Sequence, residues 1–230
     1  MRNTRKQFAM AVGGLLTILA AGSLLIAPGH IRAQGGDGAS PTANEARKII
    51  EQANAAANTT ASASGLRSVD AVNGPKRPTK MVTAVVARDG KLVKVYAQPD
   101  AWVGSIDIAI AKARTAAFFS SNENALTSRI VGVLSQAHNP DGSGGAGPLW
   151  GIGNSNQIGI TGSGEYRNGI ITFPGGVPLY RGDRLIGGVG VSGDAVDQDE
   201  FVAFAGAAGF APGAGVVKLG MTPPAVPPFP

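Results

Sequence analysis

The sequence contains no cysteine among its 230 residues and only two histidines, His30 and His138. Disulfide bonds are therefore excluded, and so are thiolate ligands to a metal ion or to haem iron. With so few histidines a Ser-His-Asp triad has little support. Ser192 also lacks the final glycine of a nucleophile elbow. The composition therefore argues against a hydrolase.

Acidic residues are absent after Glu200. This absence bears on Gly188, Gly190 and Gly193, which form a G-x-G-x-x-G pattern between an expected strand and an expected helix. A dinucleotide-binding fold needs an acidic residue on a second strand about twenty positions further on. The chain has only one helix and a proline-rich tail in that region. We therefore reject a dinucleotide site.

The first 33 residues have the order of an export signal. Three basic residues precede an apolar run at 8–27, and the small residue Ala33 follows a Pro-Gly pair. We expect cleavage after Ala33 and a protein that is secreted or periplasmic. The apolar run approaches the ~20 residues that span a bilayer, so an uncleaved anchor is the alternative.

Cleavage would remove most of the positive charge. The whole chain has 20 Lys and Arg against 15 Asp and Glu, a net charge of +5. The signal holds four of the basic residues and no acidic one, which leaves 16 against 15 and a net charge of +1. We therefore expect neither nucleic-acid binding nor, after cleavage, membrane binding.

The remaining chain opens with a polar spacer at 34–41. A helix is expected to begin after Thr42, where Glu45 three residues later completes a capping box. Its apolar face has the helical spacing i, i+3, i+4, i+7 and consists of Ala46, Ile49, Ile50 and Ala53. Residues 58–78 are rich in small and polar residues without a period, and are expected to form a loop insertion.

Two β-hairpins are expected. The first joins 81–87 to 92–96 through an Asp-Gly turn, and the second joins 177–180 to 185–192 through an Arg-Gly-Asp turn. Side chains on the last strand alternate between two faces. One face carries Leu185, Gly187, Val189 and Val191. The other carries Ile186, Gly188, Gly190 and Ser192 and is nearly bare backbone.

Strand glycines usually mark a close approach of other backbone. The natural partner is a helix at 105–119, because Ile106, Ile110, Ala113 and Ala117 form a stripe of mostly small residues on it. Direct contact of the glycines with a ligand is the alternative. Ser105 is the expected N-cap of this helix. The last helix is expected to have Asp197 as N-cap, Glu200 as its capping-box partner and Gly209 at its end.

Two motifs in this order resemble a known family. S-I-D-I-A-I-A-K-A-R-T-A-A-F-F at 105–119, and F-P-G-G-V-P-L-Y-R-G-D-R-L-I-G-G-V-G-V-S-G-D-A-V-D-Q-D-E-F at 173–201, are similar to the haem-binding family that includes the GlcG and secreted HbpS-type proteins. The resemblance implies an α+β domain of profilin-like type, with an antiparallel sheet of about five strands packed with helices.

The resemblance places this domain at 42–211. Two stretches depart from the compact family pattern as loop insertions, near 58–78 and 136–172. A proline-rich tail follows at 212–230. Loops as long as the second insertion are usually functional or disordered, and it contains His138.

Family members are oligomeric haem binders, and some are linked to haem degradation or redox sensing. The resemblance places Thr115 and its neighbours Lys112 and Arg114 beside the haem, where the cations would pair with the propionates. The competing interpretation of Lys112 and Arg114 is an ordinary solvated helix face. The candidates for an iron ligand in a chain without cysteine are His138, Met81, Met221, Tyr166 and Tyr180. His138 is the predicted metal ligand, and Tyr180 is retained as a cofactor contact.

The predicted function is an exported, homo-oligomeric haem-binding protein for haem sequestration, sensing or slow degradation. The alternative is an oligomeric accessory protein that binds a corrinoid or another planar ligand, or no cofactor. The resemblance leaves open whether the protein is an enzyme, and the size of the oligomer and the pathway cannot be read from the sequence.

Overall fold

The computed structural model describes residues 40–63, 77–138, 145–150 and 169–229. The chain divides into two units, 1–33 and 34–230, and every described residue lies in the second. The expected signal and most of the spacer therefore lie outside the described residues, as do parts of both insertions.

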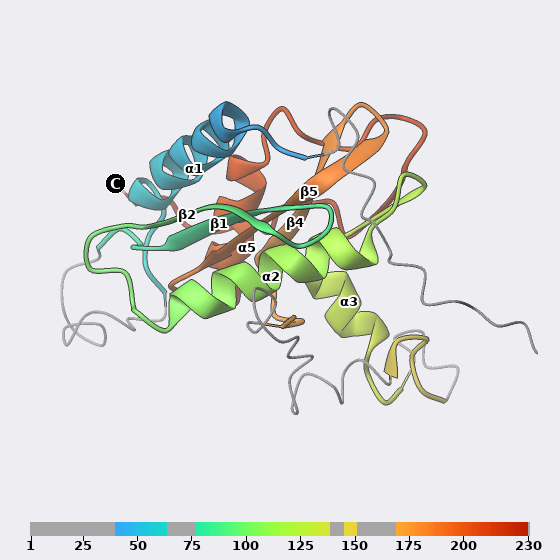
Figure 1. The fold of residues 1–230 in the computed structure, drawn as a ribbon. Coiled ribbons are helices and arrows are strands. Elements are labelled where there is room, and N and C mark those ends of the chain that lie inside the picture. The colour runs from blue at the N-terminus through green and yellow to red at the C-terminus, as the bar shows by residue number, and fades with distance from the viewer. Residues whose placement is uncertain (1–39, 64–76, 139–144, 151–168, 230) are drawn as a thin grey trace, which may run out of the picture. The chain divides into compact units, whose positions relative to one another are not determined.

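The centre of the fold is a four-stranded antiparallel sheet in the order β2-β1-β5-β4 (Figure 1). Its strands are β1 (Val82–Ala87), β2 (Leu92–Ala97), β4 (Gly176–Arg181) and β5 (Arg184–Ser192). Both expected hairpins are confirmed, because β1 pairs with β2 and β4 pairs with β5.

The expectation of about five strands in this sheet was too high. Among the described residues two further strands, β3 (Asn124–Leu126) and β6 (Val217–Leu219), pair in parallel with each other to form a second sheet. Neither has the alternation of a long strand, and each is only three residues long. The α+β class itself is confirmed.

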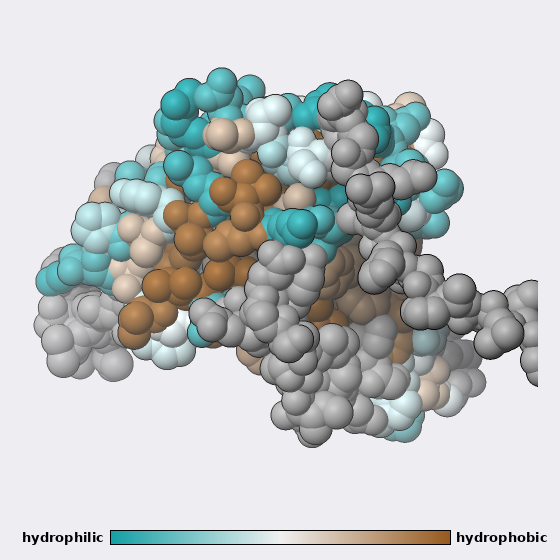
Figure 2. Space-filling view, in the orientation of Figure 1, coloured by the Kyte–Doolittle hydropathy of each residue, from teal (hydrophilic) through white to brown (hydrophobic). Residues whose placement is uncertain are grey.

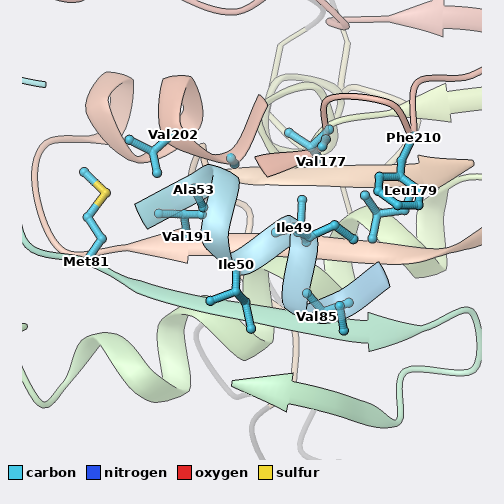
Figure 3. Close-up of a cluster of buried hydrophobic side chains, with 14 of the residues drawn as sticks. Ile49, Ile50, Ala53, Met81, Val85, Val177, Leu179, Val191, Val202 and Phe210 are labelled. Carbon is cyan, nitrogen blue, oxygen red and sulfur yellow. The ribbon is translucent and has the colours of Figure 1, made fainter. Parts of the chain in front are cut away.

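Helices cover both faces of the main sheet (Figure 1). They are α1 (Ala43–Asn58), α2 (Ser105–Phe119), α3 (Ser128–Leu134) and α5 (Val196–Gly206). The larger core lies between the sheet and the pair α1 and α5, and Figure 3 shows Ile49, Val191 and Val202 among its side chains. On the other face α2 packs its alanines on β1.

The glycine face of β5 lies against α2, as expected. A Cβ atom added at Gly190 would lie 2.0 Å from the carbonyl oxygen of Ala109, and one at Gly188 would lie 2.3 Å from that of Ala113. Both distances are far below van der Waals contact. The small side chains of α2 and the bare strand therefore allow backbone to approach backbone.

The expected alternation fails at the start of β5. The pairing register of β4 with β5 shifts between Leu179 and Tyr180, which is typical of a β-bulge. Ile186 consequently joins the core cluster of Val189, whereas Leu185, expected on the face of Val189, packs with Tyr180.

Of the three predicted helix starts, one is confirmed. Thr42 and Glu45 form both bonds of the capping box, at 3.2 and 2.7 Å. In α2 the N-cap is Gly104, and Ser105 is the first helical residue and is buried. In α5 the N-cap is Ala195, because the carboxylates of Asp197 and Glu200 bind the cation of Arg129 instead of capping the helix.

The C-terminal tail returns to the end of α1. The amide of Ala61 donates to the carbonyl of Pro227 at 3.1 Å, and the amide of Phe229 donates to that of Thr59 at 2.7 Å.

α5 ends at Gly206, and Gly209 follows in the left-handed region with φ of +86°. None of the helices within the described ranges combines the length and the hydrophobicity that crossing a bilayer requires.

Candidate functional site

Lys112 lies inside the protein. The residue as a whole is 1% exposed, and its Nζ donates to Asp199 Oδ2 at 2.7 Å and to the carbonyl oxygen of Val191 at 3.0 Å. The interpretation of Lys112 as part of a solvated face was wrong. Residues 109–117 of α2 are all buried, because β1, β4 and β5 pack on this helix. Asp199 of α5 binds the Lys112 ammonium in place of water.

Burial sets the electrostatics of this pair. Burial raises the pKa of Asp199 to about 6, although the Lys112 ammonium and the amide of Asp194 favour the carboxylate. Burial likewise lowers the pKa of Lys112, against the attraction of Asp199. Each charge offsets part of the other's desolvation cost, which ties α2 to α5.

A second ion-pair group joins α3 to the same turn of α5. Arg129 Nε lies 2.5 Å from Glu200 Oε2, and its terminal nitrogen lies 2.5 Å from Asp197 Oδ1. Glu200 is buried, and burial raises its pKa in spite of Arg129. The first turn of α5 is therefore held from two sides, by α2 and by α3.

Arg114 and Thr115 are also interior residues. Arg114 is 1% exposed, and its Nε donates to the carbonyl of Gly90 in the turn between β1 and β2 at 2.9 Å. The solvated-face interpretation is therefore wrong for Arg114 as well. The Thr115 hydroxyl is fully buried and lies 2.7 Å from the carbonyl oxygen and 3.0 Å from the amide nitrogen of Ile171.

Tyr180 has hydrogen-bond partners of its own, in the segment between α2 and α3. It is buried on β4, and its hydroxyl lies 2.7 Å from the carbonyl oxygen of Ser121 and 3.1 Å from that of Asn124. Burial raises the pKa of Tyr180 to about 12. The group is therefore a neutral phenol at physiological pH.

His138 is the exposed member of the five predicted site residues. It follows the last residue of α3, Leu134, by four positions. Of the other iron-ligand candidates, Met81 is buried in the main core and Met221 packs against two core clusters. Tyr166 lies outside the described residues. Within the described ranges, no three histidines or carboxylates gather as a metal site would require.

The structure therefore does not bring the predicted residues together as one open site. Lys112, Arg114 and Thr115 leave the same helix in different directions, toward α5, the first hairpin and the segment before β4. Helical spacing places these residues on different faces, but which face is covered depends on partners distant in sequence.

Phe173 is not among the site residues predicted from the sequence. Its side chain is 55% exposed, while its carbonyl oxygen accepts a hydrogen bond from the Ser128 hydroxyl at 2.7 Å. Trp150, 40% exposed, is also held near α3, because the preceding amide of Leu149 donates to the carbonyl of Leu134 at 2.9 Å. The available signal was an aromatic residue beside a Pro-Gly-Gly sequence.

Comparison with known proteins agrees with this fold. A Citrobacter freundii protein described as an uncharacterized 15.0 kDa protein in the dhaT-dhaS intergenic region is 30% identical over 123 residues, which cover 54% of this chain and 70% of that protein. The crystal structure of Klebsiella pneumoniae ORFY, of the DUF336 family, is 24% identical, has a TM-score of 0.50, and covers 74% of this chain and 89% of its own.

A further crystal structure, of a PduOC:heme complex, is 22% identical, has a TM-score of 0.48, and covers 74% of this chain and 94% of its own. The family described as "Haem degrading protein HbpS-like" matches residues 42–208, from the N-cap of α1 to two residues past the end of α5. The chain therefore belongs to the HbpS-like family.

Proposed function

We propose that this protein binds haem. The observation that carries the proposal is the family match over 42–208, which includes α2 and the β4-β5 hairpin. Bound haem would supply an iron centre for ligand binding or electron transfer. The chain's own residues would hold the ring and limit access to the iron.

The predicted site residues differ in how accessible they are to a haem. The hydrogen-bonding groups of Lys112, Thr115 and Tyr180 already have partners inside the chain, and Arg114 is buried as well. Direct contact of these four side chains with a haem stays a prediction, and it would require these contacts to rearrange. An exposed imidazole such as that of His138 is chemically suited to bind iron. We therefore propose His138 as the iron ligand.

We further propose that the protein is exported and sequesters haem outside the cytoplasm. The motivation is the basic, apolar and small-residue order of the first 33 residues. N-terminal sequencing of material from the periplasm or the medium tests it, with Gln34 as the expected first residue. Intact Met1 in the membrane fraction would favour the anchor instead.

Homo-oligomer formation is part of the same proposal. Leu92, Val95 and Tyr96 of the edge strand β2 are each more than a third exposed, and Figure 2 shows hydrophobic residues gathered over this region. Sedimentation velocity of the cleaved protein measures its mass in solution. A monomer at all concentrations would contradict this part.

The central experiment is a haemin titration of the protein from residue 34 onward. We expect a shifted Soret band that saturates at a fixed stoichiometry. A parallel titration with cobalamin tests the corrinoid alternative. Ascorbate and oxygen added to the complex distinguish degradation, seen as loss of the Soret band, from sequestration. An absorbance that grows without saturation would overturn haem binding.

A further inference from the structure

The segment before β4, residues 171–176, is held more firmly than a connecting loop requires. The hydroxyl of Thr115 accepts from the amide of Ile171 at 3.0 Å, and its hydrogen is shared between the carbonyl of Ile171 at 2.7 Å and that of Ala111 at 2.9 Å. The hydroxyl of Ser128 donates to the carbonyl of Phe173 at 2.7 Å and accepts from the amide of Gly176 at 2.8 Å. Two hydroxyls thus fix four backbone groups of six residues.

The C-terminal end of this segment, at Gly175 and Gly176, is also tightly packed. The carbonyl of Gly175 accepts from the amide of Val191 at 2.9 Å. A Cβ added at Gly176 would lie 2.3 Å from the carbonyl oxygen of Lys112, and Gly175 has φ of +116°. The backbone therefore has little freedom to move away from α2.

Against this fixed backbone the side chain of Phe173 stands 55% exposed. A flexible loop could fold such a ring onto the surface. Here the bonds of Ser128 to the Phe173 carbonyl and of Thr115 to the Ile171 backbone fix the main chain from which the ring projects. A rigidly presented aromatic ring gives up little conformational entropy when a ligand covers it. That is the property expected of a binding residue.

The surroundings of Phe173 agree with the proposed haem site. Ser128, which holds its carbonyl, is the first residue of α3, and Leu134, which holds the segment of Trp150, is the last. The proposed iron ligand His138 follows four positions later. A seven-residue helix is only about 10 Å long. The segments that carry the exposed rings of Phe173 and Trp150 are thus bonded to the two ends of α3, and His138 follows the C-terminal end of that helix.

We propose that Phe173 is the aromatic contact for the planar face of the haem, and that Thr115 and Ser128 are positioning residues that hold it in place. This inference rests on the proposed function. It gives Thr115 a role in haem binding that acts through the segment 171–176 and needs no exposure of its own side chain.

Haemin titrations of wild type, Phe173→Ala and Phe173→Tyr test the contact. We expect Phe173→Ala to weaken haemin affinity about tenfold, or roughly 1.4 kcal/mol, and Phe173→Tyr to retain it. Phe118→Ala is the matched control, because Phe118 is 45% exposed at the end of α2 and is expected to leave affinity unchanged.

The outcomes separate the two proposals. If wild type does not bind haemin, the proposed function fails and the contact with it. If wild type binds and Phe173→Ala binds equally well, only the contact is overturned. A Phe173→Ala variant that changes sedimentation but not haemin affinity would assign the ring to subunit contact, and that also overturns the inference.

The positioning role needs a measurement that loss of stability alone would not explain. We expect Thr115→Ser to retain haemin affinity and Thr115→Val to weaken it. In the Phe173→Ala background the Thr115→Val effect should disappear, because the residue being positioned is gone. Equal weakening in both backgrounds, with matched melting temperatures, would overturn the role of Thr115.

Discussion

Lys112 Nζ lies 2.7 Å from Asp199 Oδ2, and the two side chains are 2% and 3% exposed. The pair joins α2 to the first turn of α5, and Lys112 also bonds to the carbonyl of Val191 near the end of β5. One buried charge pair therefore connects both helices to the strand that lies between them.

Loss of one partner of this pair should be costly. Lys112→Met leaves Asp199 buried without its cation, and we expect unfolding free energy to fall by about 3–5 kcal/mol. Replacing both residues, as Lys112→Met with Asp199→Leu, should recover most of this loss. Urea unfolding measures both variants. A single variant as stable as wild type would show that the buried carboxyl does not depend on Lys112.

The raised pKa of Tyr180 predicts a specific alkaline behaviour. The folded protein holds this proton up to about pH 12, whereas an unfolded tyrosine releases it near its ordinary value of 10.0. The stability from this group is therefore complete below pH 10 and is lost as pH rises toward 12.

Tyr180→Phe tests this dependence. The variant should lose about 0.5–1.5 kcal/mol near neutral pH, because the hydrogen bond to the Ser121 carbonyl is removed. Between pH 10 and about 12 its stability should fall less steeply than that of wild type. Urea titrations at several pH values give both slopes, and parallel slopes would contradict the assignment.

The close contact of β5 with α2 predicts that Gly190 tolerates no side chain. A Cβ there would lie 2.0 Å from the Ala109 carbonyl oxygen, so Gly190→Ala should destabilise the fold by about 1–3 kcal/mol and Gly190→Val by more. Gly206→Ala is the comparison, because its nearest neighbours would be 3.2 Å away. Equal melting temperatures for Gly190→Ala and wild type would mean that this face is open.

His138→Ala should change the haem spectrum and leave the fold unchanged. The residue is exposed, so its removal breaks no core contact. If His138 ligates the iron, the low-spin spectrum of the haemin complex should disappear. Gln136→Ala, also exposed and two residues earlier, is the control. An unaltered spectrum in His138→Ala would exclude this ligand.

The local elements were predictable from the sequence alone. Thr42 and Glu45 cap α1 because the two bonds form between residues three positions apart. Both hairpins follow from turn residues between strand-forming runs, and the bare face of β5 predicted its close packing on α2. These features depend on short-range geometry, which the order of residues states directly.

Only the tertiary structure decided what the charged and aromatic residues do. The sequence spacing of Asp197 and Glu200 is that of capping residues, but Arg129, which is 68 and 71 positions away from them, binds both carboxylates. Lys112 would be a solvated lysine if α5 did not cover it with Asp199. The environment of a cationic side chain depends on which distant segment packs on it. The periodicity of its own helix does not predict that segment.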